Sequence, residues 1–256
     1  MAIMNLTPDS FYANSRMESL QKVVDKAGAF IEEGASIIDI GGQSTRPGAI
    51  MISEEEEIER VSGSIESISK AFPTVKVSID TFQSKVAKAA IEAGATIVND
   101  ISCGSFDPDI LEVVAQYKVG YIGMHITGTK DTMHVIPERT DIIEELIHFF
   151  TQKKQLLADK GIQDWVIDPG FGFGKTIQDN FTIIKDLRKL AIIQLPILIG
   201  VSRKSSIYKT LGISAEEALN GTTVVNTIAL KNGASILRVH DVKEARQAIT
   251  LMEYLQ

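Results

Sequence analysis

Polar side chains recur along this 256-residue chain at one kind of position, the point where a short apolar run ends. There are eight such runs, and each is followed by an amphipathic stretch. The polar residues that close them are, in chain order, Asn5, Asp39, Asp80, Asn99, His125, Asp168, Ser202-Arg203-Lys204 and Arg238-Val239-His240. Amides, carboxylates and cations bind polar ligands and stabilise developing charge, so these residues are the first candidates for a functional site.

Three of these side chains favour a nitrogen heterocycle as the ligand. Asp80, Asn99 and Asp168 offer acceptors and donors that suit a flat ring with N–H and amino groups. The negative charge of the two acids disfavours a phosphate at the same place. The alternative for any one of them is a helix cap, since Asp80-Thr81 and Asn99-Asp100 are residue types that cap helices.

A second group favours an anion. Arg238 and His240 are two residues apart, so both point to the same side of an extended segment. Together with Lys204 they predict an anion cradle, because the loops after the seventh and eighth strands of βα barrels are frequent phosphate sites. The amide oxygen of Asn5 can bind a cation or orient a phosphate.

Two glycine-rich segments predict shaped loops. Residues 41–48 contain three glycines and one proline, which is typical of a lid, and Arg46 among them can bind a carboxylate or phosphate bidentately; a surface arginine is the alternative. Residues 168–175 place Phe171 and Phe173 between alternating glycines, which matches neither the phosphate-loop nor the dinucleotide spacing. We expect a tight loop that presents an aromatic ring to a planar ligand, with inward packing of the rings as the alternative.

The apolar runs predict strands, and the stretches between them predict helices. The strands are expected at residues 2–6, 36–40, 75–79, 96–99, 120–124, 165–167, 197–201 and 235–239. The helices are expected at residues 20–33, 53–72, 83–93, 110–117, 140–160, 177–190, 215–231 and 242–255. Continuous Val/Ile/Leu runs are typical of parallel strands buried on both faces. Eight βα units at nearly regular spacing favour an α/β fold of one kind, a single (β/α)8 TIM barrel with its active site at the C-terminal ends of the strands, over an open doubly wound sheet.

The bulk composition excludes several classes of protein. A formal net charge of −7 disfavours a broad nucleic-acid surface, so we expect no nucleic-acid partner. No apolar run approaches the ~20 residues that span a bilayer, and no secretory signal is visible, so we expect no membrane partner. Cys103 is the single cysteine, which excludes an internal disulfide and a cysteine zinc cage and fits a cytoplasmic location.

As a set, these motifs resemble the dihydropteroate synthase family. They follow the family's order over essentially the whole chain: residues 4–11 (MNLTPDSF), 38–48 (IDIGGQSTRPG), 78–81 (SIDT), 99–101 (NDI), 124–125 (MH), 168–175 (DPGFGFGK), 202–205 (SRKS) and 238–241 (RVHD). The resemblance implies a (β/α)8 barrel with residues 1–256 as a single pterin-binding domain, commonly a homodimer. It implies a transferase of folate biosynthesis that joins (7,8-dihydropterin-6-yl)methyl diphosphate to 4-aminobenzoate and releases 7,8-dihydropteroate and diphosphate.

Residue by residue, the resemblance implies three binding regions. The implied pterin pocket is Asp80, Asn99, Met124, Asp168, Phe173 and Lys204. The implied neighbours of 4-aminobenzoate are Thr45, Arg46, Phe173, Ser202 and Lys204. The implied diphosphate ligands are Asn5, Thr45, Arg238 and His240, and Asn5 is also the implied protein ligand of Mg²⁺, the expected cofactor.

The implied mechanism is a dissociative, SN1-like substitution. Its catalytic residues would be Lys204, Asp80, Asp168, Arg238 and His240. Diphosphate leaves first, because Mg²⁺ and the cations neutralise its growing charge. The arylamine then attacks the pterin methylene cation held near the two acids. The resemblance assigns no strong general base, since the departing diphosphate can take the amine proton.

The chain departs from the family pattern in the first loop and at the N-terminus. Phe11 is followed by Tyr12-Ala13-Asn14-Ser15-Arg16, where the family usually has Ser-Asp-Gly-Gly. The turn at residues 124–130 also differs mildly. The segment that plugs the barrel floor ahead of the first strand is absent from the sequence, so we expect a truncated, excised or misplaced start.

Three other functions stay open from the sequence. A pterin-binding methyltransferase domain that serves a corrinoid protein would share Asp80, Asn99 and Asp168 but would not need the anion cradle. A Schiff-base aldolase would use Lys204, which would then require an apolar surround. A catalytically degenerate pterin-binding barrel would keep the pocket and lose the reaction.

Overall fold

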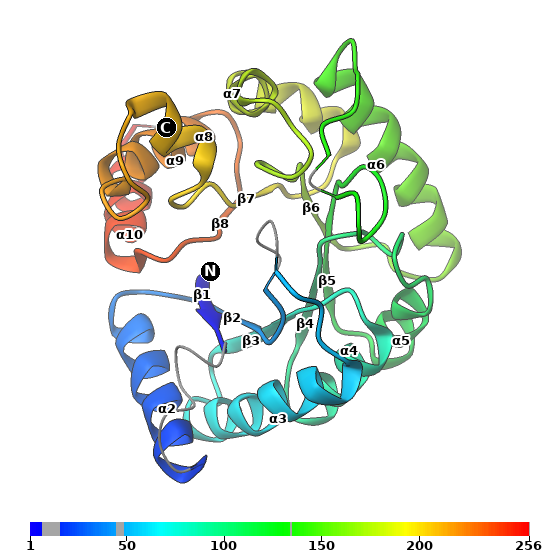
Figure 1. Ribbon diagram of the computed structural model, residues 1–256, viewed down its shortest axis with the longest axis vertical. Coiled ribbons are helices and arrows are strands. Elements are labelled where there is room, and N and C mark those ends of the chain that lie inside the picture. Colours follow the sequence, from blue (N-terminus) through cyan, green and yellow to red (C-terminus); the bar gives the residue numbers. More distant parts are fainter. Residues whose placement is uncertain (7–15, 45–48, 134, 256) are drawn as a thin grey trace. The chain divides into compact units, whose positions relative to one another are not determined.

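The computed structural model describes residues 1–6, 16–44, 49–133 and 135–255 of the chain. Within these residues the chain divides into two compact units, Met1–Tyr121 and Ile122–Gln256. Figure 1 colours the first unit from blue to green and the second from green to red. None of the helices in the described part of the chain has the length and apolar character that a bilayer crossing requires.

The first unit is built on parallel strands that follow one another in chain order. They are β1 (Ala2–Asn5), β2 (Ile37–Gly41), β3 (Lys76–Asp80) and β4 (Ile97–Asp100). The helices are α2 (Arg16–Glu32), α3 (Glu54–Ala71), α4 (Ser84–Glu92) and α5 (Asp109–Tyr117) (Figure 1). The strands are buried on both faces, as the continuous apolar runs predicted, and residues such as Ile38, Ile40 and Ile79 have no exposed surface.

The second unit continues the alternation of strands and helices. Its strands are β6 (Val166–Asp168), β7 (Leu198–Ile199), β8 (Ile236–Leu237) and most of β5 (Gly120–Met124), which begins at the end of the first unit. β5 pairs with β6 and β7 with β8, all parallel, and a parallel bridge joins Ile167 to Ile197. The helices are α6 (Ile142–Asp159), α7 (Ile177–Asp186), the 3₁₀ helix η1 (Leu187–Ile193), α8 (Ser205–Leu211), α9 (Leu219–Lys231) and α10 (Val242–Glu253) (Figure 1).

The sequence predicted all eight strands to within three residues at each end. It missed α8, which has seven residues and ends at Gly212 in the left-handed region, because a helix of two turns shows too little periodicity. The helix expected at residues 177–190 is α7 followed by η1, so it changes type at Leu187. Gly34, Gly94, Gly161 and Gly233 follow α2, α4, α6 and α9, and all have the positive φ that is typical of a glycine that ends a helix.

Candidate functional site

In the first unit, three predicted site residues lie in one row across the ends of neighbouring strands. Asn5 is in register with Gly41, Gly41 with Asp80, and Asp80 with Asn99. A Cβ atom placed on Gly41 would lie 3.5 Å from Asn5 Oδ1 and 3.7 Å from Asp80 Oδ2. The side chains of Asn5 and Asp80 therefore both border Gly41, at the strand ends where the sequence predicted that polar side chains would lie.

Buried Asp39 orients the amide of Asn99. Asn99 Nδ2 donates a hydrogen bond of 3.1 Å to Asp39 Oδ2, and Asn99 is only 5% exposed. Because a buried amide with a fixed donor has a fixed acceptor direction, Asn99 is held ready for a ligand. The sequence placed Asp39 among the polar strand ends without giving it this part.

Asp100 stabilises the turn that follows β4 and does not cap a helix. Its carboxylate accepts from Ser102 N and Oγ, Gly104 N and Tyr121 Oη at 2.6–2.8 Å. Burial raises the pKa of this carboxyl group, and these donors oppose the rise. The acid thus shapes the turn after β4 that follows Asn99, so the helix cap considered for Asn99-Asp100 is not what forms.

Gln43, which follows β2, makes hydrogen bonds to three backbone groups. Its Nε2 donates to the carbonyls of Ser44 and Ile50 at 2.7 and 3.2 Å, and its Oε1 accepts from Ile52 N at 2.8 Å. Thr45, predicted to contact 4-aminobenzoate and diphosphate, and Arg46, predicted to contact 4-aminobenzoate, lie outside the described residues. The sequence analysis missed Gln43, although a glutamine between glycines and a proline was the available signal.

In the second unit, Met124 and Asp168 are the corresponding neighbours. They are in register at the ends of β5 and β6, and both are buried. Asp168 Oδ1 accepts a hydrogen bond of 2.7 Å from Gly170 N. Burial raises the pKa of Asp168, while the charges of Lys204, Arg238 and Lys175 oppose that rise. Asp168 is therefore a buried acid that interacts with three cations of the second unit, two of them predicted site residues.

The two phenylalanines of the loop at residues 168–175 differ in their environment, so each of the two predicted arrangements, inward packing and exposure, occurs once. Phe171 has no exposed surface and packs inward, whereas Phe173 is partly exposed. Lys204 Nζ donates to the carbonyl of Phe171 and lies 4.8 Å from the centroid of the Phe173 ring. The lysine therefore touches the loop that carries the aromatic ring, which favours the predicted aromatic wall beside a cation.

Ser202 and His240 form a direct pair. Ser202 Oγ lies 2.9 Å from His240 Nδ1 and accepts from His240 N at 3.2 Å. Arg238 packs beside Gly200, where an added Cβ would lie 3.7 Å from Arg238 Cβ. Two of the three residues predicted for the anion cradle, Arg238 and His240, thus follow β8, which pairs with β7, and His240 contacts Ser202 beyond the end of β7.

Arg203, between Ser202 and Lys204, points elsewhere. It binds Asp241 through two hydrogen bonds of 2.9 Å and donates to the carbonyls of Ala215 and Glu216. Its pKa is raised by the hydrogen bond to Asp241. The two adjacent cations therefore have different contacts: Arg203 binds Asp241 and backbone carbonyls, and Lys204 faces the ring of Phe173.

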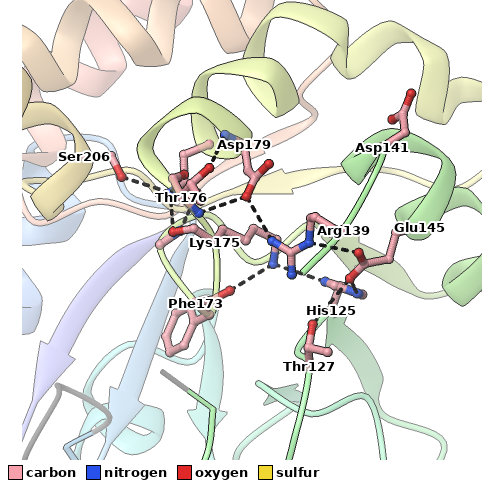
Figure 2. A network of polar contacts seen from close by, with 12 residues as sticks. His125, Thr127, Arg139, Asp141, Glu145, Phe173, Lys175, Thr176, Asp179 and Ser206 are labelled. Atoms are coloured by element: carbon pink, nitrogen blue, oxygen red, sulfur yellow. Dashed lines mark hydrogen bonds and ion pairs between the residues drawn. The ribbon is translucent and has the colours of Figure 1, made fainter. Parts of the chain in front are cut away.

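A buried polar network that the sequence did not predict contacts the loop at residues 168–175 through Lys175 (Figure 2). It links Lys175, His125, Glu145, Arg139 and Asp179. Burial lowers the pKa of His125 to about 4, and the hydrogen bond from His125 lowers the pKa of Glu145 to about 2. The lysine and the histidine were visible in the motifs, but Arg139 and Glu145 had no sequence signal.

The protein groups suit a magnesium ion that is held mainly by its substrate. The described residues contain no cluster of three His, Cys, Asp or Glu side chains around a common point. Mg²⁺ is commonly held by one or two protein oxygens together with substrate phosphates and water. The exposed amide of Asn5 at the end of β1, with Asp80 on the other side of Gly41, fits that pattern.

A substitution at Gly170 tests how tightly the loop at residues 168–175 is packed. Its φ is +71°, and an added Cβ would lie 2.1 Å from the carbonyl oxygen of His125. We expect Gly170→Ala to lower the free energy of unfolding by about 2–5 kcal/mol, since overpacking adds to the cost of a left-handed alanine. Gly161→Ala is the matched control, with φ +82° and no atom within 4 Å of the added carbon. Equal losses in urea titrations of the two variants would contradict this packing.

The comparisons with known proteins agree with the geometry. The family described as pterin binding enzymes matches residues 1–240. Dihydropteroate synthase of Synechocystis is 40% identical over 258 residues, covering 100% of this chain and 89% of the relative. Dihydropteroate synthase of Xanthomonas albilineans, solved with 4-aminobenzoic acid, is 36% identical with a TM-score of 0.91 and covers 100% of this chain and 92% of that one. The same enzyme solved with 7,8-dihydropteroate has a TM-score of 0.89 at 33% identity, with 100% and 92% covered.

Matches of this extent define the class first: the chain belongs to the pterin-binding enzymes and has their fold. The relatives narrow that class further. The chain belongs to the dihydropteroate synthase family of transferases, and the predicted (β/α)8 barrel is confirmed as its fold.

Proposed function

We propose that this chain condenses (7,8-dihydropterin-6-yl)methyl diphosphate with 4-aminobenzoate to give 7,8-dihydropteroate and diphosphate. The proposal is carried by one observation: buried Asp168 begins the loop whose Phe171 carbonyl accepts a hydrogen bond from Lys204, and the charges of Lys204 and Arg238 oppose the rise in the pKa of that acid. A pterin needs a carboxylate for its N–H groups, and a departing diphosphate needs cations. Membership of this family disfavours the two other enzyme hypotheses, the Schiff-base aldolase and the methyltransferase domain.

The acids and the amide hold the pterin. Asp168 and Asp80 accept hydrogen bonds from ring N–H and amino groups, and Asn99, oriented by Asp39, adds a donor and an acceptor. Met124 and Phe173 form apolar walls beside the ring. Both carboxylates also lower the energy of the positive charge that develops on the pterin methylene carbon when the diphosphate bond breaks.

The cations bind and neutralise the leaving diphosphate. Arg238 can bind two phosphate oxygens at once, and His240, whose Nδ1 is engaged with Ser202, offers Nε2. Asn5 would hold Mg²⁺, which when bound supplies Lewis-acid stabilisation of the diphosphate charge. Ser202 and Lys204, with Thr45 and Arg46, would border 4-aminobenzoate, and its amine nitrogen attacks the methylene carbon while its proton passes to diphosphate.

The proposal is tested by product formation with the purified chain. We expect 7,8-dihydropteroate and diphosphate to appear in equal amounts only when the pterin diphosphate, 4-aminobenzoate and Mg²⁺ are all present. Chelation with EDTA should abolish turnover yet leave equilibrium binding of an unreactive pterin unchanged, because the pterin contacts are protein groups. Wild-type protein that binds pterin but forms no product would indicate the catalytically degenerate barrel instead.

We also propose that the chain acts as a homodimer through α9 and α10. These helices pack together in the second unit and border a groove lined by Thr227, Leu251 and Leu255, among others. Val224, Leu251 and Leu255 are 50%, 67% and 75% exposed, and apolar side chains gathered in this way are typical of an interaction surface.

Sedimentation equilibrium tests the dimer. We expect wild-type protein and Ile192→Glu to be dimers and Leu251→Glu to be a monomer. Ile192 is the matched control because it is 71% exposed but lies on η1. A monomeric wild type, or a dimer that survives Leu251→Glu, would contradict the proposal.

A further inference from the structure

Behind the aromatic wall of the second unit lies a string of polar contacts that the proposed reaction does not use. It begins at the site acid. Asp168 Oδ1 accepts from Gly170 N at 2.7 Å, the carbonyl of Gly170 accepts from Phe173 N at 3.1 Å, and the carbonyl of Phe173 accepts from Lys175 Nζ at 3.1 Å. The loop that carries both the acid and the ring is thus tied, link by link, to one lysine.

Beyond Lys175 the string reaches two helices (Figure 2). Lys175 Nζ lies 3.1 Å from His125 Nδ1, and His125 Nε2 lies 3.2 Å from Glu145 Oε1 on α6. Arg139 then joins Glu145 Oε2 at 2.9 Å to Asp179 Oδ2 at 3.1 Å. Asp179 forms the capping box of α7 with Thr176, so the string ends at rigid secondary structure.

The protonation states fit these contacts. Burial lowers the pKa of His125 to about 4, so its ring is neutral; it donates from Nε2 to Glu145 and accepts at Nδ1 from Lys175. Burial, with the charge of Arg139, also lowers the pKa of Lys175 to about 7, while Asp168 and Glu145 oppose this and Lys204 adds to it. A neutral amine has two hydrogens for its two acceptors, so the contacts hold in either state.

The loop has little room to move away from this lysine. An added Cβ on Gly174 would lie 3.1 Å from the carbonyl of Val135 and 3.3 Å from that of Met133. On the other side, Gly172 N donates to Asn180 Oδ1 at 2.7 Å, and Asn180 Nδ2 donates to Ser206 Oγ at 2.9 Å. Lys175 is 6% exposed, so it binds the loop from within the protein and not from solvent.

We propose that Lys175 is a positioning residue for pterin recognition: through the carbonyl of Phe173 and through His125, it holds the 168–175 loop so that Phe173 and Asp168 meet the pterin together. The lysine itself does not contact the substrate. This inference rests on the proposed function, because it assigns the loop the pterin as its ligand.

A double-mutant cycle measures this action. Equilibrium binding of an unreactive pterin is compared for wild type, Lys175→Met, Phe173→Ala and the double variant. Methionine keeps the length of the side chain and removes its donors. We expect Lys175→Met to weaken binding by at least tenfold in the wild type but by less than threefold when Phe173 is already alanine, because residues that act through one another are not additive.

Lys154→Met is the matched control. Lys154 lies on α6 in the second unit and, like Lys175, donates to a backbone carbonyl, that of Ile193 at 2.6 Å. It should leave pterin binding unchanged in both backgrounds. In turnover, Lys175→Met should raise KM for the pterin diphosphate about as much as it weakens binding, with kcat within threefold of wild type.

Three results would overturn the inference. They are unchanged binding by Lys175→Met, an equal loss with and without the Phe173 ring, and an equal loss in Lys154→Met. Failure of the proposed function looks different, because wild type would then form no dihydropteroate, whereas the binding cycle needs no turnover.

Discussion

Asp168→Asn is expected to lower kcat/KM by roughly 10²–10⁴-fold. The variant keeps the shape of the side chain, and its amide oxygen can still accept from Gly170 N, which the acid does at 2.7 Å. It loses the charge that strengthens each hydrogen bond to the pterin, about 1.5–3 kcal/mol for a bond to a charged group. It also leaves Lys204, Arg238 and Lys175 without the carboxylate that they face.

Steady-state kinetics and pterin binding check this expectation. Asp186→Asn is the matched control, since Asp186 is an acid of the same unit that pairs with Lys189. The control should retain wild-type kinetics. If Asp168→Asn kept more than a tenth of wild-type kcat/KM, the acid would not be the group that recognises the pterin.

The sequence predicts most of this site because strand ends are read directly from apolar runs. Asn5, Asp80 and Asn99 stand at one register since the runs that precede them end together on parallel strands. Ser202 and His240 pair for the same reason, across β7 and β8. Where a residue type closes a strand, position in the chain determines position in the site.

The supporting residues could not be predicted in this way. Glu145 lies on a helix and Arg139 in a connection, and only the folded chain brings them to His125 and Lys175. Gln43 makes three hydrogen bonds to the backbone, at Ser44, Ile50 and Ile52. Such contacts depend on side-chain directions outside the regular elements, for which apolar periodicity carries no information.

The residues proposed to contact substrate and those that hold them in place are therefore interleaved along the chain. Lys175 follows Phe173 by two positions, and Arg203 stands between Ser202 and Lys204. Adjacent residues with the same charge thus have opposite expected effects on stability and on catalysis, and this can be measured within one tripeptide.

Lys204→Met is expected to lower kcat/KM by roughly 10²–10³-fold, with little loss of stability. Lys204 lies 4.8 Å from the Phe173 ring centroid, and its charge opposes the rise in the pKa of Asp168, so we propose that this charge acts on both substrates. Losing one charge-assisted interaction with each substrate costs about 3 to 4 kcal/mol in the transition state. Within the protein it donates a hydrogen bond to the carbonyl of Phe171, and a methionine of similar length keeps the packing of its stem.

Arg203→Met should give the opposite pattern. It breaks the bidentate pair with Asp241 and two bonds to backbone carbonyls, and we expect the free energy of unfolding to fall by about 1–3 kcal/mol. Activity per folded molecule should stay within threefold of wild type, because Arg203 faces away from the aromatic wall. Urea titration and steady-state kinetics on both variants separate the two effects. Loss of activity in Arg203→Met with unchanged stability would contradict the assignment of the neighbouring lysine as the substrate cation.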